Sequence, residues 1–221
     1  LDFTISADNV NAIRWMSAGE DTLSIGTTGG EWVPSSTGAV ITPSDVTVRR
    51  QTTHGSAQVV PVRVDNIVLF VQRAKRKIRE FGFTFETDGY RAFDMTRLAQ
   101  HITVSGIVEM DHAEEPDSQV WVVRADGQLP AMTFRRQEDV VGWSRHILGG
   151  AFGTGDAIVE SVSVIAGSNG AGQHHDSTSR DEVWIQVKRT INSATVRYIE
   201  MFERDYDTTH DATDAIYSDS C

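Results

Sequence analysis

The sequence predicts an all-β protein, a propeller-like array of antiparallel β-hairpins or blades with one short helical insert. Three observations lead to this prediction over the 221 residues. Alternation of apolar and polar residues at period 2 dominates, β-branched residues are frequent, and helical periodicity is almost absent. A strand–turn–strand unit also recurs along the chain, which favours a repeat architecture.

Thirteen segments have strand patterns, in which successive side chains alternate between the two faces of a sheet. In chain order they are 12–16, 22–26, 31–34, 46–50, 67–72, 78–85, 102–110, 120–124, 129–135, 140–146, 158–166, 183–188 and 195–203.

The repeated unit is a polar lead-in, an apolar strand, a basic residue, a short polar turn and a second alternating strand. Three clear copies are DNIVLFVQRAKRKIREFGFTF from Asp65, DSQVWVVRADGQLPAMTFR from Asp117 and RDEVWIQVKRTINSATVRYIEMF from Arg180; a weaker one starts at Asp21. Their spacing is close to the roughly 40 to 50 residues typical of propeller blades. Matching positions are Leu23, Val68, Val120 and Val183.

The first strand of two copies is almost continuously apolar, over 68–71 and 120–123. An antiparallel strand with one wet face alternates, so a continuous run predicts burial on both faces. Blades stacked face to face provide such burial. A β-sandwich with long connections is the alternative.

One segment, Asp94–His101, has a helical pattern. Asp94 is suited to cap the free amides at its start. Met95, Leu98 and Ala99 would then share one face.

The composition excludes several classes of protein. The formal net charge is −11, which disfavours binding to nucleic acid because phosphates are neutralised by clustered Lys and Arg. The single cysteine, Cys221, allows neither an internal disulfide nor a cysteine-based zinc site. No run approaches the roughly 18 apolar residues of a membrane span.

The chain divides into a predicted β domain over 1–203 and an acidic terminal segment over 204–221. From Glu203 onward there are six carboxylates and one arginine, so almost half of the excess negative charge lies there. The opening at Leu1 and the close at Cys221 look like those of a piece of a longer polypeptide, whose flanks would hold the missing parts.

Two segments invite comparison with ligand sites. His174 and His175, with Asp176 or Asp181, offer metal ligands, but adjacent imidazoles on a Gly/Ser-rich loop are more typical of a surface loop. The run Gly149–Gly155 resembles a phosphate loop, but no Lys-Ser/Thr follows it and the chain continues as strand. An inter-strand loop is the better interpretation.

Two charged clusters are also candidates. Five carboxylates within nine positions would suit acid–base chemistry or a cation, although a solvated polar connector is the simpler interpretation. They are Glu109, Asp111, Glu114, Glu115 and Asp117. A dense basic patch would suit nucleic acid or an acidic partner, but it lacks the interleaved aromatic residues of a stacking platform. It comprises Arg73, Lys75, Arg76, Lys77 and Arg79.

No G-x-S-x-G elbow is present, and the five tryptophans fall on predicted strands, where core or blade-to-blade packing explains them. We therefore assign no catalytic, cofactor-binding or metal residues. The residues by themselves favour a structural or interaction protein over an enzyme.

Five segments carry a resemblance to known proteins: VNAIRWMSAGEDTLSIGTTGGEWVPSS, ITPSDVTVRRQTTHGSAQVVPVRVDNIVLFVQRAKRKIREFGF, DEVWIQVKRTINSATVRYIEMFE, DMTRLAQHI and EEPDSQVWVVRADGQL. They resemble a family of bacteriophage and prophage virion structural proteins, the tail nozzle or tail tube proteins of short-tailed phages. The resemblance implies a propeller fold and no catalytic residues.

The resemblance also implies a role and a set of partners. The chain would form a ring with copies of itself, six-fold in symmetry, next to adaptor and other tail proteins. It would be made in the bacterial cytoplasm and work in the virion, where DNA passes through the ring without specific binding. Acidic groups that face a lumen would keep the duplex from adhering.

Two alternatives remain at the level of the sequence. A receptor- or glycan-binding or glycan-processing propeller of a tail spike or fibre would need a concave pocket with convergent carboxylates and exposed aromatic residues. An intracellular scaffold propeller of the WD type would need Gly-His and Trp-Asp blade signatures, which are absent.

Overall fold

A computed structural model of the chain describes residues 11–19, 22–38, 41–42, 45–166 and 180–202. It divides into two compact units, Leu1–Ile107 and Val108–Cys221. The prediction of an all-β protein is confirmed: the described residues form antiparallel sheets, and their only helices are two 3-10 turns. The acidic segment 204–221 lies outside the described residues.

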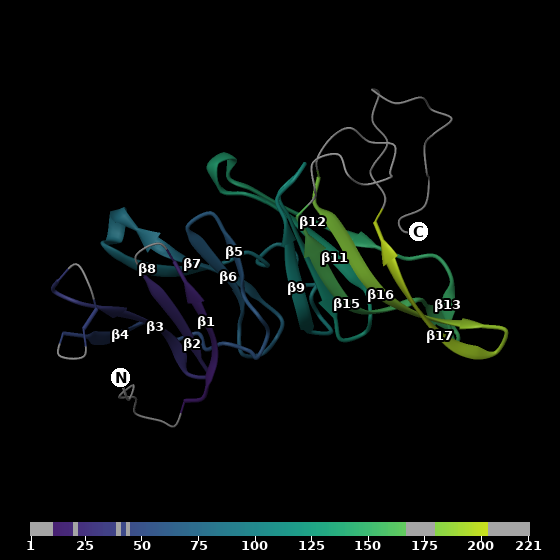
Figure 1. Cartoon of the computed structure of the whole chain (residues 1–221), viewed down its shortest axis with the longest axis horizontal. Helices are drawn as coiled ribbons and strands as arrows, with labels where there is room; N and C mark the ends of the chain where they lie inside the picture. The colour runs from purple at the N-terminus through teal and green to yellow at the C-terminus, as the bar shows by residue number, and fades with distance from the viewer. Residues whose placement is uncertain (1–10, 20–21, 39–40, 43–44, 167–179, 203–221) are drawn as a thin grey trace. The chain divides into compact units, whose positions relative to one another are not determined.

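Unit 1 contains two four-stranded sheets, each a meander in which consecutive strands are neighbours (Figure 1). The first meander comprises β1 (Ile13–Ala18), β2 (Leu23–Thr27), β3 (Gly30–Ser35) and β4 (Thr47–Thr52). The second meander comprises β5 (Val62–Val64), β6 (Ile67–Val71), β7 (Ile78–Thr84) and β8 (Gly89–Asp94).

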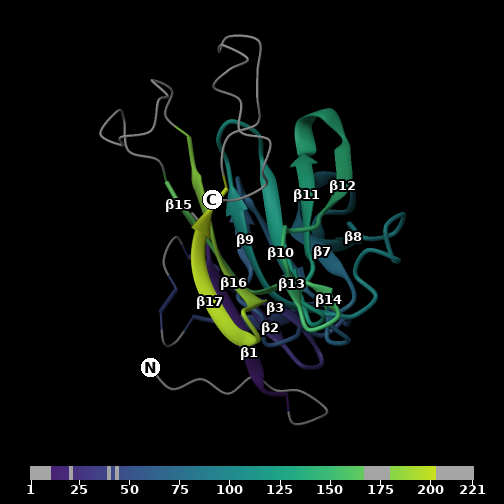
Figure 2. The same ribbon diagram turned by 90° about the vertical axis from the view of Figure 1, so that its right-hand side faces the viewer.

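A third meander and a three-stranded sheet follow, and most of their residues lie in unit 2. The third meander comprises β9 (Ile107–Ala113), β10 (Gln119–Arg124), β11 (Leu129–Arg135) and β12 (Val140–His146). The small hairpin β13 (Ala151–Phe152) and β14 (Gly155–Asp156) precedes the last sheet. That sheet comprises β15 (Ile158–Ile165), β16 (Glu182–Ile191) and β17 (Ala194–Met201), which are neighbouring ribbons in Figure 2.

The recurring hairpins of the sequence are the pairs β2–β3, β6–β7, β10–β11 and β16–β17. The first three are the central strands of four-stranded meanders, so the repeat is one blade-like sheet per copy. The predicted burial of the apolar runs is also confirmed. All five residues of β6 are buried, as are the last five of β10.

Consecutive sheets are joined by a backbone hydrogen bond that recurs with the sequence repeat. The acceptors are backbone carbonyl groups at the end of β2 and in the turns after β6 and β10, namely those of Thr27, Lys75 and Gly127. They accept from the N–H groups of Ser56, Ile107 and Val159, respectively, at 2.8, 2.7 and 2.9 Å. The donors recur at intervals of 51 and 52 residues. Each central hairpin therefore anchors the chain at the point where it enters the next sheet.

Two apolar cores hold the sheets in pairs within the units. In unit 1, Trp15 and Val33 of the first meander pack with Phe70 and Phe81 of the second. In unit 2, Trp121 and Leu129 of the third meander belong to one cluster with residues of β15 and β16, including Ile185. These contacts confirm that Trp15 and Trp121 are packing residues.

The prediction of a helical insert over Asp94–His101 is wrong. After β8 the chain forms successive turns, in which the N–H groups of Ala99, Ile102 and Gly106 donate to the carbonyl oxygens three residues earlier. Leu98 is 95% exposed, so the apolar face expected of a helix does not exist. Asp94 nevertheless accepts from the Thr96 N–H at 3.0 Å, as expected of a cap.

Thirteen of the strands were predicted, several of them shifted by a few residues. The predicted start of the strand over 102–110 is wrong, because β9 begins at Ile107. The sequence analysis missed β5, β8, β13 and β14. Among the described residues no helix is long and apolar enough to cross a membrane.

Gly127 should be the most sensitive glycine at the sheet junctions. Its φ is +82°, and a Cβ there would lie 2.4 Å from Cγ2 of Ile158. We expect Gly127→Ala to lower the free energy of unfolding by about 2 kcal/mol, because it adds a clash to backbone strain. Urea unfolding measures this. The matched control is Gly153→Ala, where φ is +62° but a Cβ meets nothing within 4 Å; equal losses at both positions would contradict the clash.

Candidate functional site

The best candidate for a functional site is a polar cluster in unit 1, because several titratable groups with displaced pKa values gather there. Its members come from the first meander, from the segment that leads to the second meander, from the β6–β7 turn, and from β7, β8 and the turns that follow β8. We call it the inter-sheet polar cluster. It comprises Glu31, Thr52, His54, Ser56, Gln72, Lys77, Arg79, Asp94 and Thr96.

Glu31 is at the centre of the cluster and is fully buried. A register shift between Glu31 and Trp32 places Glu31 opposite Thr52 of β4. Its carboxylate accepts from the hydroxyl of Thr52, from Oγ of Ser56 at 2.9 Å and from the backbone of His54. Burial raises the pKa of Glu31 above its usual range, although these hydrogen bonds and Arg79 act in the opposite direction.

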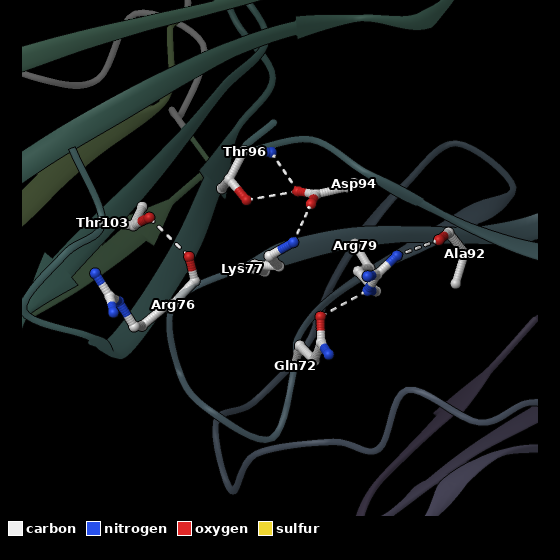
Figure 3. Close-up of polar contacts among 8 residues, drawn as sticks. All are labelled: Gln72, Arg76, Lys77, Arg79, Ala92, Asp94, Thr96 and Thr103. Atoms are coloured by element: carbon white, nitrogen blue, oxygen red, sulfur yellow. Dashed lines mark hydrogen bonds and ion pairs between the residues drawn. The ribbon is translucent and has the colours of Figure 1, made fainter. Parts of the chain in front are cut away.

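Arg79 of β7 reaches the cluster from the second meander. Its Nε donates to Oε1 of Gln72 at 2.8 Å and its guanidinium donates to the carbonyl of Ala92 at 2.7 Å (Figure 3). Burial lowers the pKa of Arg79, while Asp94 and Glu31 raise it. Arg79 is thus held within its own sheet and also balances the charge of Glu31.

Lys77 and Asp94 form an ion pair across the β7–β8 hairpin, with Nζ 2.8 Å from Oδ2 (Figure 3). Oδ1 of Asp94 also accepts from Oγ1 of Thr96 at 2.6 Å. Burial raises the pKa of Asp94, but the hydrogen bonds from Lys77 and Thr96 outweigh it and leave the pKa below its usual range. The pair therefore fixes the start of the turns that follow β8.

The imidazole of His54 lies in the field of this cluster. Burial is the largest cause that lowers its pKa, and Arg79 and Lys77 lower it further, against a smaller opposite effect of Asp94. A neutral imidazole at neutral pH follows from this environment.

The chemistry of the inter-sheet polar cluster is that of a structural lock. A nucleophilic serine needs an adjacent base and access to substrate. Ser56 is only 1% exposed and its hydroxyl donates directly to Glu31. The cluster therefore satisfies buried polar groups and ties β3, β4 and the 52–56 segment together, with Arg79 supplying charge from β7.

The sequence analysis favoured a solvated connector for the acidic run, and this prediction is wrong for two of its residues. Glu109 and Asp111 lie on β9, and their carboxylates accept from the backbone N–H groups of Val162 at 3.2 Å and Val164 at 2.7 Å. Those amides belong to β15, an edge strand of its sheet. The two side chains thus satisfy donors at an edge that would otherwise be open to pairing.

The other three acidic residues lie around the cis peptide bond that precedes Pro116. The backbone N–H groups of Glu114 and Glu115 donate to the carboxylate of Asp181, at 2.6 and 3.2 Å. Asp117 forms an ion pair with Arg135. The run is therefore distributed over three separate structural contacts and does not form one acidic site.

Asp111→Ala tests the role of the acidic run. We expect a loss of about 1–2 kcal/mol in the free energy of unfolding, because the partly buried amide of Val164 loses its acceptor. Hydrogen exchange should become faster at Val164 while the Gly127–Val159 junction stays protected. Unchanged exchange at Val164 would contradict the contact. Glu86→Ala, at an exposed carboxylate, is the control.

The basic patch is split by the structure. Arg73, Lys75 and Arg76 are exposed on the β6–β7 turn, whereas Lys77 and Arg79 are held in the inter-sheet polar cluster.

The glycine-rich run and the histidine loop are the remaining candidate segments from the sequence. Gly149–Gly155 overlaps the β13–β14 hairpin, in agreement with an inter-strand connection. His174, His175 and Asp176 lie outside the described residues. Within the described part of the chain, no group of three or more His, Cys, Asp or Glu side chains could hold a metal ion.

Sequence reasoning missed Glu31, Thr52 and Ser56. The available signal was the acidic residue within the predicted strand 31–34, where alternation places Glu31 on the same face as the apolar Val33 and opposite Trp32. Comparison with known proteins adds no assignment, because no protein-family model and no curated protein matches the chain.

Proposed function

We propose that the chain is a non-enzymatic structural component of a phage tail, as a subunit of a nozzle or tail-tube ring. The observation that carries the proposal is the resemblance of its long segments to tail proteins of short-tailed phages. The repeated blade-like meanders support it, since such sheets are the units of a propeller.

The use of polar residues in the described structure also supports a structural role. The buried carboxylate of Glu31 joins segments of unit 1, and the carboxylates of Glu109 and Asp111 satisfy the edge of β15. The hydrogen bonds of these carboxylates are made within the fold. A binding or catalytic site would instead direct convergent polar groups toward a ligand.

The proposed partners are copies of the chain in a six-fold ring, adjoining tail and adaptor proteins, and DNA in transit. The net charge of −11 suits a conduit to which a duplex does not adhere. The protein would be made in the bacterial cytoplasm and be retained in the virion.

Immunogold electron microscopy of intact virions tests the proposal, with antibodies raised against the chain. We expect label at the tail, below the capsid vertex, and no label on particles that lack tails. Label on lateral fibres, together with cleavage of host polysaccharide by the purified chain, would contradict the proposal and favour a glycan-processing propeller.

A further inference from the structure

We infer a head-to-tail contact between copies of this chain, in which the tip of the β7–β8 hairpin docks on the turns that follow β8. The inference rests on the proposed ring and specifies how neighbouring subunits meet. It starts from the two most exposed large apolar side chains of the described structure, Leu98 at 95% and Phe85 at 90%. The two side chains lie in surroundings of opposite charge.

The acidic tip is defined by Phe85, Glu86 and Asp88. Phe85 is held in place by an edge-to-face contact with Phe83, with ring centroids 5.2 Å apart, and the Asp88 N–H donates to the Phe85 carbonyl. Glu86 and Asp88 are exposed, and neither forms an ion pair with another described residue. The nearby cation Arg91 instead donates to Oγ1 of Thr87.

Phe85 ends a continuous series of ring contacts that begins in the core of unit 1. Rings of Trp15, Phe70, Phe81, Tyr90 and Phe83 follow one another with centroid distances of 5.1–6.4 Å, and Phe83 contacts Phe85. The tip is thus an exposed continuation of the interface between the two meanders, and its aromatic anchor is already positioned for a partner.

The basic surface is defined by Arg73, Lys75, Arg76, Arg97 and His101, together with Leu98. It forms because two segments without any carboxylate, 66–79 and 95–108, are held together. Oγ1 of Thr103 donates to the carbonyl of Arg76 at 2.7 Å, and the Ile107 N–H donates to the carbonyl of Lys75 at 2.7 Å (Figure 3 shows the first). All six defining residues are exposed.

The acidic tip and the basic surface of one molecule are at opposite ends of the same hairpin. β7 and β8 pair from Arg79–Asp94 to Thr84–Gly89; the tip follows the second pair and the turns follow the first. Six paired residues at about 3.4 Å each separate them by roughly 17 Å or more. The contact must therefore join different molecules, and such a heterologous contact closes into a ring when the rotation allows it.

An acidic protein surface fits the basic surface better than nucleic acid does. The segment that carries Arg97 and His101 also exposes Leu98. A leucine would contact an apolar anchor but contributes nothing to a phosphate backbone. The whole chain is also strongly acidic, so duplex DNA is repelled from the remainder of the molecule. The acidic tip supplies both the apolar anchor and the carboxylates.

Sedimentation equilibrium of the full chain and its charge-reversal variants tests the contact. Glu86→Lys and Arg97→Glu should each weaken self-association by about tenfold or more, because each places like charges in contact. The same chain carrying both substitutions should recover to within about threefold of the unmodified chain. Glu138→Lys, at the exposed tip of the β11–β12 hairpin, is the matched control and should change little.

Each other outcome overturns the inference. It fails if the unmodified chain stays monomeric at high concentration and low salt, or if either single reversal leaves association unchanged. It also fails if the double variant does not recover while circular dichroism shows an intact fold. Loss of binding to a 30-base-pair duplex in Arg97→Glu, with self-association unchanged, would assign the surface to nucleic acid. The immunogold labelling of the tail does not depend on self-association of the purified chain. Failure of the head-to-tail contact can therefore be distinguished from failure of the proposed function.

Discussion

Phe70→Ala should lower the free energy of unfolding of unit 1 by about 3–5 kcal/mol, the range for removal of a fully buried aromatic side chain. Phe70 lies on β6, is completely buried and contacts the rings of Trp15 and Phe81. Its removal opens a cavity between the two meanders. Urea unfolding followed by hydrogen exchange in β6 and β7 measures the loss.

Phe85→Ala is the matched control for this experiment. It removes the same side chain at the exposed end of the same series of rings, so we expect a change within about 0.5 kcal/mol. A large loss at Phe85, or a small one at Phe70, would contradict the assignment of the core. Faster exchange confined to unit 2 would contradict it as well.

Glu31→Ala should have the second largest effect, a loss of about 3 kcal/mol. The substitution leaves the hydroxyls of Thr52 and Ser56 and a backbone donor at His54 without their buried acceptor. It also removes the negative charge that faces Arg79. Urea unfolding at neutral pH gives the magnitude, and stability equal to that of the unmodified chain would contradict the structural lock.

Glu31→Gln, which keeps the size and the acceptor, separates charge from hydrogen bonding. Because burial raises the pKa of folded Glu31 above 4.5, the folded state binds its proton more readily than the unfolded state. Its contribution to stability is therefore fully present below the unfolded pKa and is lost as the pH rises through the folded pKa. The glutamine variant lacks this loss, so its stability relative to the unmodified chain should increase above pH 4.5.

Two other groups in the cluster change the stability with pH in the opposite direction to Glu31. Asp94 and His54 have lowered pKa values, so their contributions are lost as the pH falls through their folded pKa values. The difference between the glutamine variant and the unmodified chain cancels these shared contributions. Urea unfolding from pH 4 to 8 measures that difference; a constant value would show that Glu31 does not titrate as its burial implies, and Glu86→Gln provides the exposed control.

The strands and the repeated hairpins could be predicted because their signals are local. The apolar runs of β6 and β10, for example, follow from a few neighbouring residues. β8 was missed because Gly89–Asp94 has a weak pattern and pairs through the hairpin tip. The helix was wrong because the exposure of Leu98 depends on how 95–105 is held against the β6–β7 turn.

The inter-sheet polar cluster could not be predicted from the sequence. Glu31 meets Thr52 and Ser56, which are 21 and 25 residues away, only after a register shift between β3 and β4. The roles of Glu109 and Asp111 depend in the same way on β15, 53 residues further along. Such contacts are set by tertiary pairing, which local propensity does not encode.

We propose that this chain contributes blade-like sheets to a structural ring in a phage tail. A cryo-electron microscopy reconstruction of the intact virion tests it most directly. We expect density for both units in a six-fold ring around the DNA path, with the acidic tip of one copy on the basic surface of the next. Density for the chain only in lateral fibres or spikes, or its absence from the virion, would contradict the proposed ring.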